Sequence, residues 1–449
     1  MAVKIILLIL FFGVMMGIGV YARKHATDVN GFVLGGRSVG PWLTAFAYGT
    51  SYFSAVVFVG YAGQFGYKYG LASTWIGIGN AVLGSLVAWV VLGRRTRIMS
   101  KHLGSMTMPD FFGKRYDSQS LRIAASVIAF IFLIPYTASV YNGLSYLFGM
   151  AFDVDFRICV VVMAVLTGVY VIIGGYMATA WNDLIQGIIM LFGIVAVIAA
   201  VLSGHGGFMA AVKELAQVPS SVMPGAYASF LGPDPANLFG VVILTSLGTW
   251  GLPQMIQKFY AIKDEKAVHT GTIISTLFAI VVSGGCYFLG GRISGVKEAV
   301  DGTVKYDTII PTMLSSLPDI LIGIVIVLVL SASMSTLSSL VLTSSSTLTL
   351  DFIKPLFVKK MNEKQQLVWM RVLLAGFILI SVVIALDPPA FIAQLMGISW
   401  GALAGAFLAP FLYGLYWKGV TRAAVWASFI CGVGITVANM FFRFIASPI

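Results

Sequence analysis

The densest group of side chains able to bind a small cation lies in a segment without charge. Residues 331–349, SASMSTLSSLVLTSSSTLT, hold twelve Ser or Thr. On a helix, Ser335 and Thr336 stand three and four residues after Ala332, so both hydroxyls lie over the turn that exposes the Ala332 carbonyl. Three uncharged oxygens can then converge on one hard cation. The alternative is that small hydroxyl residues only let membrane helices pack closely and bond their own backbone.

A second oxygen cluster and a lone carboxylate stand nearby in this pattern. Ser338 and Ser339 follow Ser335 at the same spacing. Asp183, in GGYMATAWNDLIQG, is the only carboxylate near the start of its apolar segment. An acid at membrane depth is a functional candidate, because burying its charge costs several kcal/mol unless it is paired. Alternatively, Asn182 and Asp183 cap the amino end of a helix near the membrane surface.

Two other apolar segments contain residues that interrupt a helix. The first is broken near its middle by Gly49, Thr50, Ser51 and Ser54. An unwound stretch there would free carbonyl oxygens for an ion. The second contains LGTWGLPQ, where Gly248, Gly251 and Pro253 break the helix and Trp250 offers a stacking face. A plain kink is the alternative for both segments.

Composition places all these residues in a membrane. The 449 residues are 59% hydrophobic and 10% charged, with a mean hydropathy of +0.94, whereas soluble domains carry about 25% charged residues. Several stretches without Asp, Glu, Lys or Arg can cross the hydrocarbon layer, which takes about 20 residues. They are residues 123–152, 158–182, 184–212 and 320–350.

Other classes of protein are disfavoured. The net charge of +11 is not gathered in a basic, aromatic, polar domain, so no nucleic-acid partner is expected. The three cysteines lie in apolar runs as small buried hydrophobes: Cys159, Cys286 and Cys431. The four histidines fall in loops or at helix ends: His25, His102, His205 and His269. Without a catalytic set inside the membrane, we expect neither an enzyme nor a cofactor.

The apolar runs predict about twelve transmembrane helices in an all-α protein. The first is kept as a helix because Arg23 and Lys24 follow it, the reverse of a cleaved secretory signal. The predicted segments are 3–22, 40–66, 72–93, 121–148, 156–175, 178–202, 238–257, 270–291, 319–349, 367–386, 391–415 and 421–446.

Basic residues predict the orientation, because Lys and Arg concentrate in cytoplasmic loops. With the N-terminus outside the inner membrane, 20 of the 28 basic residues fall inside, Lys258 among them. The other eight are Lys4, Lys68, Arg157, Lys213, Arg292, Lys297, Lys305 and Arg443. The even helix count places the C-terminus outside too. No loop is long enough for a soluble domain, so residues 1–449 form a single multi-pass domain.

On these residues, the chain resembles the sodium/solute symporter family from about residue 3 to residue 446. The matching stretches are GGRSVGPWLTA, GGYMATAWNDLIQG and SASMSTLSS. GYKYGL, GLPQMIQKFYAIKDEKAVH and LAPFLYGLYWKG are more similar to the sodium/pantothenate branch than to the sodium/proline one. The resemblance implies a leucine-transporter-type core of two inverted five-helix repeats, here 40–202 and 238–415, with extra helices at 3–22 and 421–446.

The resemblance also implies where sodium binds. The main site would use the backbone carbonyls of Thr50, Phe53 and Ala332 with the hydroxyls of Ser335 and Thr336. Sodium/sialic acid symporters have a second sodium site. Its matching positions here are Asp183, Ser335, Ser338 and Ser339.

Three departures from sodium/proline symporters argue against proline. That branch has an aspartate where this chain has Tyr52, and a tryptophan and a tyrosine where it has Thr245 and Thr249. The chain also ends after twelve segments, where related members commonly have thirteen or more.

We expect alternating-access symport of sodium with a small organic solute, a pantothenate-like or short monocarboxylate or an amino acid such as proline. The solute would meet the positive end of a half-helix. The pocket residues would be Tyr52, Ser54, Tyr136, Thr249, Trp250, Pro253 and Gln394. The expected partners are the solute, sodium and lipid, for a monomeric carrier. A proton-coupled or uncoupled permease, or a sensor that transports nothing, are the alternatives.

Overall fold

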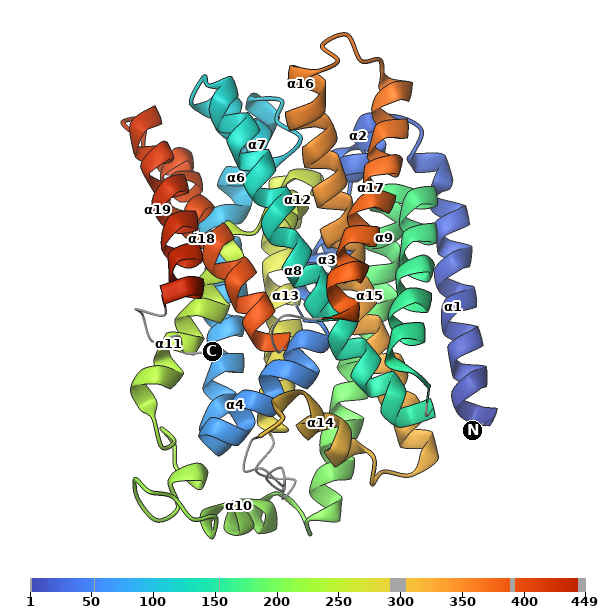
Figure 1. The fold of residues 1–449 in the computed structure, drawn as a ribbon, viewed down its shortest axis with the longest axis vertical. Helices are drawn as coiled ribbons and strands as arrows, with labels where there is room; N and C mark the ends of the chain where they lie inside the picture. The colour runs from blue at the N-terminus through green and yellow to red at the C-terminus, as the bar shows by residue number, and fades with distance from the viewer. Residues whose placement is uncertain (1, 52, 153, 291–303, 388–391, 443–449) are drawn as a thin grey trace.

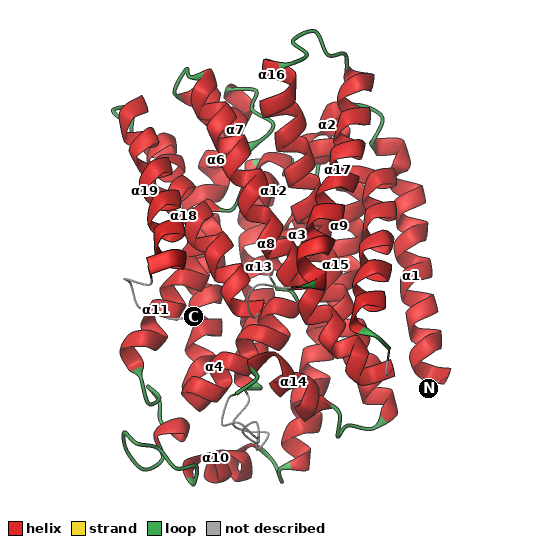
Figure 2. Ribbon diagram, in the orientation of Figure 1, coloured by secondary structure: helices red, strands yellow, loops and turns green. Residues whose placement is uncertain are grey.

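The computed structural model describes residues 2–51, 53–152, 154–290, 304–387 and 392–442. Throughout this part of the chain the secondary structure is helical, and only one isolated β-bridge occurs, between Val39 and Ile262 (Figure 2). Most helices run along the length of the molecule, side by side (Figure 1). An all-α architecture is therefore confirmed.

The helices follow the predicted apolar segments closely. They are α1 (Ala2–Ala22), α2 (Val29–Leu34), α3 (Pro41–Thr50), α4 (Ala62–Tyr69), α5 (Thr74–Gly79), α6 (Arg94–His102), α7 (Met108–Arg115), α8 (Gln119–Phe152), α9 (Phe156–Gly204), α10 (Phe208–Ala216), α11 (Pro235–Leu247), α12 (Pro253–Ala261), α13 (Glu265–Phe288), α14 (Tyr306–Leu314), α15 (Asp319–Thr347), α16 (Lys354–Leu356), α17 (Glu363–Leu386), α18 (Ile392–Tyr416) and α19 (Arg422–Phe442). Wider or tighter turns extend several of them, namely η3 (Val56–Tyr61), η5 (Asn80–Val87), η8 (Gly248–Gly251) and η10 (Leu348–Ile353).

Among the described residues, nine continuous helices are long and apolar enough to cross a membrane, or ten with the bent pair α11–α12. Two of them, Val56–His102 and Phe156–Gly204, have 47 and 49 residues. At about 1.5 Å per residue, each is roughly twice as long as the hydrocarbon layer is thick. Each contains a glycine with positive φ, Gly70 or Gly175, where the chain changes direction. The exact count of twelve spans stays a prediction.

The hydroxyl-rich helix α15 lies at the centre of the bundle. In its most apolar window 78% of the residues are buried, against 22% for α1 and 11% for α19, which lie at the two edges in Figure 1. A helix buried all round needs neighbours on every side, and α15 contacts α9, α8, α1 and α3. Its small Ser and Thr side chains allow these close approaches.

Both predicted helix breaks occur. α3 ends at Thr50, and the helix resumes at η3, where the Ser54 hydroxyl accepts a bond from the Val56 N–H at 3.1 Å. In the second break η8 is followed by Leu252 in extended conformation and by Pro253 as the first residue of α12. The segment bends there by 51°, because proline lacks the N–H that would continue the helix. α3 and α12 are in contact.

The second broken segment ends later than predicted. The sequence prediction stopped at residue 257 and placed Lys258 in a cytoplasmic loop, but α12 continues to Ala261 and Lys258 is buried. That prediction was wrong, because a single basic residue after an apolar run is typical of a membrane boundary. Here the lysine instead points into the bundle.

Candidate functional site

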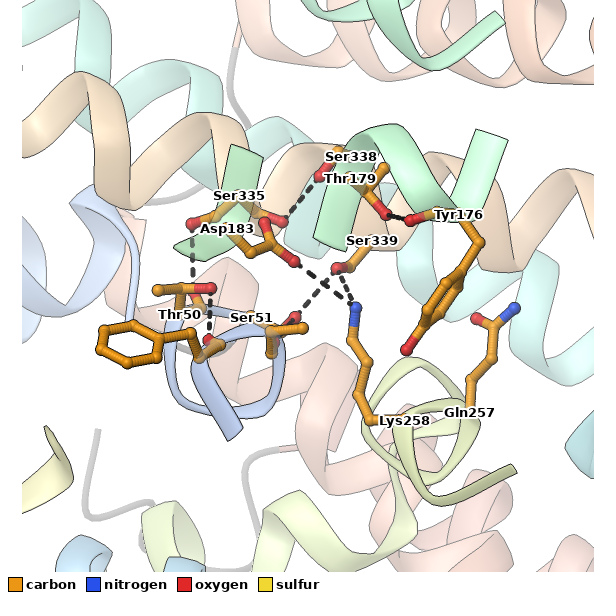
Figure 3. A network of polar contacts seen from close by, with 12 residues as sticks. Thr50, Ser51, Tyr176, Thr179, Asp183, Gln257, Lys258, Ser335, Ser338 and Ser339 are labelled. Atoms are coloured by element: carbon orange, nitrogen blue, oxygen red, sulfur yellow. Dashed lines mark hydrogen bonds and ion pairs between the residues drawn. The ribbon is translucent and has the colours of Figure 1, made fainter. Parts of the chain in front are cut away.

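Four uncharged oxygens meet where the break of α3 touches α15. The Ser335 Oγ and Thr336 Oγ1 atoms each lie 3.2 Å from the Thr50 carbonyl oxygen and 3.1 Å from the Ala332 carbonyl oxygen. Thr50, Ser335 and Thr336 are fully buried, and Figure 3 shows Thr50 and Ser335 facing each other. The hydroxyls donate to these carbonyls, and rotation of the O–H groups would turn their lone pairs toward an ion between them.

The local fold explains why the Thr50 carbonyl is available. The last carbonyls of a helix have no N–H partner four residues further on, and they carry the partial negative charge of the helix dipole. α3 ends at Thr50, so this carbonyl faces α15 rather than another turn of its own helix. The arrangement favours a cation without placing a carboxylate in the cluster.

The fifth predicted ligand, Phe53, lies just beyond the break. It is buried, and its ring packs near that of Phe278 with the centroids 6.2 Å apart. The four oxygens above come from Thr50, Ala332, Ser335 and Thr336, and membership of the Phe53 carbonyl stays a prediction.

The second predicted oxygen set contains an unexpected residue. Asp183 Oδ2 lies 3.8 Å from the Lys258 ammonium, which donates to Ser339 Oγ at 2.9 Å (Figure 3). Ser339 Oγ also lies 2.8 Å from Ser51 Oγ, whereas Ser338 donates to the Ser335 carbonyl at 2.9 Å. A lysine thus stands between the carboxylate and one of the three serines predicted to share a sodium ion with it.

Sequence reasoning missed Lys258, although a signal was present. Gln254, Gln257 and Lys258 stand at spacings of three and four and so share one face of α12. That face is turned inward: Gln257 donates to the Val33 carbonyl at 2.8 Å and accepts from Thr343 at 2.6 Å. A polar stripe on a helix following a break indicates an interior face.

The predicted solute-binding residues surround the two breaks, but several are engaged locally. Thr249 donates to the Ser246 carbonyl at 2.8 Å, and Trp250 Nε1 donates to the Leu83 carbonyl at 3.0 Å. Ser54 and Pro253 are buried at the restarts of their helices, and Gln394 is half-buried on α18. Tyr52 lies outside the described residues.

Tyr136 belongs to a pair of aromatic residues that the sequence did not predict. Its ring meets that of Trp400 edge to face, with the centroids 5.9 Å apart, and Trp400 lies against Gly248 in the second break. The Tyr136 hydroxyl is buried beside the side chains of Trp400 and Ser54. Within the described part of the chain, the Tyr136 hydroxyl, the Trp400 Nε1 and the neighbouring Ser399 hydroxyl nevertheless make no hydrogen bond of good geometry. Buried polar groups are normally paired, so these atoms are candidates to contact a polar solute.

Ionic contacts hold together the end of the molecule that carries the basic loops. Arg37 donates to Ser100 and to the Ser105 carbonyl, which ties the segment before α3 to α6 and the loop after it. Arg122 bridges Asp351 at 2.7 Å and Asp110 at 3.2 Å, beside a cleft of about 700 Å³. At this end of the molecule α12 also contacts α2, α6 and α7.

Two broken helices in contact beside a buried cluster of uncharged oxygens are typical of ion-coupled membrane carriers. Residues 32–432 match the model of the sodium:solute symporter family, so the chain belongs to that family. It is 30% identical to sodium/proline symporter 2 of Staphylococcus saprophyticus over 446 residues, 96% of this chain and 85% of the relative. It is 29% identical to the osmoregulated proline transporter of Bacillus subtilis, over 96% of this chain and 88% of the relative.

The fold likeness extends to solved structures. A Na⁺-coupled sialic acid symporter in a substrate-bound outward-open state matches with a TM-score of 0.77, covering 98% of this chain and 92% of that one at 16% identity. A transporter of the nucleobase-cation-symport-1 family matches with a TM-score of 0.55, covering 93% of this chain and 96% of that one at 13% identity. The predicted leucine-transporter-type fold is confirmed, and the chain is a sodium-coupled symporter of a small organic solute.

Proposed function

We propose that sodium binds among the oxygens of Thr50, Ala332, Ser335 and Thr336 and couples its gradient to the inward movement of a small carboxylate or amino acid. One observation carries the proposal: two buried hydroxyls of α15 converge on the carbonyl that the break of α3 exposes. Binding of the ion ties these two helices together, which stabilises the outward-facing conformation of the first break and completes the solute pocket.

The solute pocket lies at the second break, on the Tyr136, Trp400 and Gly248 side. The Tyr136 phenol and the Trp400 indole N–H, which make no well-aligned hydrogen bond among the described residues, supply hydrogen bonds to the solute. The amino end of α12 supplies the partial positive charge that a carboxylate needs. This pocket binds an anion without a membrane-buried arginine.

The choice of solute lies between two chemistries. The named relatives above are proline transporters, which supports a secondary-amine amino acid. The residues at positions 52, 245 and 249 differ from those of sodium/proline symporters, and other stretches are similar to the pantothenate branch, which supports a different carboxylate. We therefore keep proline and pantothenate as the two leading solutes.

The orientation follows from charge. α6, α7 and the turn between α16 and α17 lie at the end of the molecule opposite the N-terminus (Figure 1), and they carry many of the basic residues. We place that end in the cytoplasm and the N-terminus outside the cell membrane, with a monomer as the working unit. Transport then needs no covalent chemistry and no cofactor besides the coupling ion.

Uptake into proteoliposomes tests the function. The purified protein is reconstituted and given labelled proline, pantothenate, short monocarboxylates and sialic acid, with and without an inward sodium gradient. Accumulation of one solute only with the gradient, weakened in Ser335→Ala and Thr336→Ala, supports the proposal. Uptake that a proton gradient drives without sodium would indicate the permease alternative. Solute binding without uptake would indicate a sensor.

A further inference from the structure

The interior of the bundle holds one ion pair close to the proposed sodium site. Asp183 on α9 and Lys258 on α12 are 0% and 2% exposed. The carboxylate oxygen and the ammonium nitrogen are 3.8 Å apart, too far for a hydrogen bond but close enough for direct charge attraction. Each charge would be costly to bury alone, so each requires the other.

The ammonium occupies the place that an ion would take. It donates to Ser339 Oγ at 2.9 Å, faces Asp183, and lies 5.2 Å from the centroid of the Tyr176 ring. A carboxylate, a hydroxyl and an aromatic face form a cation-binding environment. Ser338 donates instead to the Ser335 carbonyl of its own helix.

A sodium ion bound to Asp183 beside the ammonium would be repelled by it. The repulsion between two unit charges about 4 Å apart, at an effective dielectric constant near 20, weakens sodium binding by roughly a thousandfold. A second ion therefore cannot join the Asp183 group while Lys258 stays charged and in place.

The pair is also connected to the first site through two hydroxyls. Ser339 Oγ, the acceptor of the ammonium, lies 2.8 Å from Ser51 Oγ. Ser51 directly follows Thr50, whose carbonyl belongs to the sodium cluster. The lysine thus joins α12, α9 and α15 at the level of the break in α3.

We propose that the Lys258 ammonium is a built-in cation that fills the second cation site of this chain, so that one sodium ion binds and the other is replaced by a lysine. The inference rests on the proposed function, since it takes the Thr50 cluster as the site of the remaining ion. Because the ammonium is part of α12, it holds the inner half of the second broken helix against α9 and α15 and is never released.

Equilibrium binding of radioactive sodium to the purified full-length protein, without solute, tests the stoichiometry. The wild type is expected to bind one ion per chain. Lys258→Met leaves Asp183 uncompensated and is expected to bind two. The double variant Asp183→Asn with Lys258→Met removes both charges and is expected to bind one sodium ion per chain again. Lys258→Arg keeps the positive charge and is also expected to bind one.

The outcomes separate this inference from the proposed sodium site. Two ions bound by the wild type would overturn it, as would a Lys258→Met variant that binds one ion in both neutral and alkaline buffer. If Lys258→Met fails to fold, the wild-type count still decides. Loss of all sodium binding in the double variant Ser335→Ala with Thr336→Ala supports the first sodium site. Unchanged sodium binding in that variant would refute the proposed function, but it would leave the number of ions bound by the wild type as a separate result.

Discussion

Ser335 and Thr336 supply the two site oxygens that a substitution can remove without altering the backbone. Replacing either by alanine is expected to raise the sodium concentration for half-maximal uptake by roughly tenfold to a hundredfold, since a lost buried partner costs about 1–3 kcal/mol. Sodium titration of uptake measures this. Among the described residues Ser346, on the same helix, bonds the Leu342 carbonyl of its own helix and no oxygen of the proposed site, so Ser346→Ala should leave the titration unchanged. An equal effect in all three variants would mean that α15 is merely destabilised.

Tyr136 and Trp400 should act on the solute and not on the ion. Tyr136→Phe and Trp400→Phe each remove a buried polar atom that makes no well-aligned hydrogen bond among the described residues. KM for the solute should therefore rise by about tenfold, the effect of losing one hydrogen bond to the solute. Sodium binding should be unchanged. Tyr413→Phe, on the exposed face of α18, is the control. A lowered sodium affinity with an unchanged KM would contradict the assignment.

At this scale the sequence predicted which oxygens meet at the proposed ion site better than it predicted their surroundings, and sodium binding by these oxygens stays a prediction. Thr50, Ala332, Ser335 and Thr336 were identifiable because helical spacing and a helix break are local properties. Lys258 and Trp400 could not be identified from the sequence, because their surroundings depend on which helices face them. Asp183 was recognised as a candidate, but its partner comes from 75 positions further along the chain.

Among the elements, Gly175 is the point where one 49-residue helix becomes two differently directed segments. Its φ of 55° with ψ of −150° is essentially restricted to glycine, and an added Cβ would lie 2.8 Å from the Phe32 ring. Gly175→Ala should destabilise the protein by roughly 2 kcal/mol or more, lowering its melting temperature in detergent. Gly376→Ala on α17, where the Cβ meets nothing within 4 Å, should have little effect or a small stabilising one.

The docking of α14 against the start of α18 should depend on pH. Burial raises the pKa of Asp307 to about 6, although the carboxylate accepts a bond from the Ile392 N–H at 3.2 Å. The folded state therefore holds this proton more tightly than the unfolded state, so stability is greatest below about pH 4 and decreases as the pH rises toward 6. The contribution is roughly 2–3 kcal/mol at most.

Thermal unfolding in detergent across this pH range measures the effect. Asp307→Asn imitates the protonated side chain, so its melting temperature should exceed that of the wild type at neutral pH and should lose this part of the pH dependence. An unchanged pH profile in the variant would show that other groups are responsible.

The elements were predictable where hydrophobicity alone defines them. α15, α17 and α18 begin and end within a few residues of the predicted segments, because a helix in lipid must satisfy every backbone group internally. The end of α12 could not be predicted, because the apolar run stops at Lys258, a basic residue that tertiary contacts bury. Short elements outside the spans, such as α2 and α14, have no hydropathy signal.

For the whole molecule, the orientation in the membrane is directly testable. Single cysteines at Lys213 on α10 and at Lys359 after α16, both exposed, are introduced after the native cysteines are replaced. An impermeant maleimide added to intact cells should label the first site and not the second, which should react only after permeabilisation. The reverse pattern would place the N-terminus inside.

The four oxygens around the proposed ion carry no formal charge, and the nearby Asp183 and Lys258 cancel each other. The empty carrier is therefore electrically neutral at this depth. Loaded with sodium and a zwitterion such as proline it holds a single positive charge, whereas loaded with sodium and an anion such as pantothenate it stays neutral. A transmembrane voltage, which contributes about 2.3 kcal/mol per charge per 100 mV, would then accelerate the inward step for the zwitterion, leave that step almost unaffected for the anion, and leave the return of the empty form almost unaffected for both.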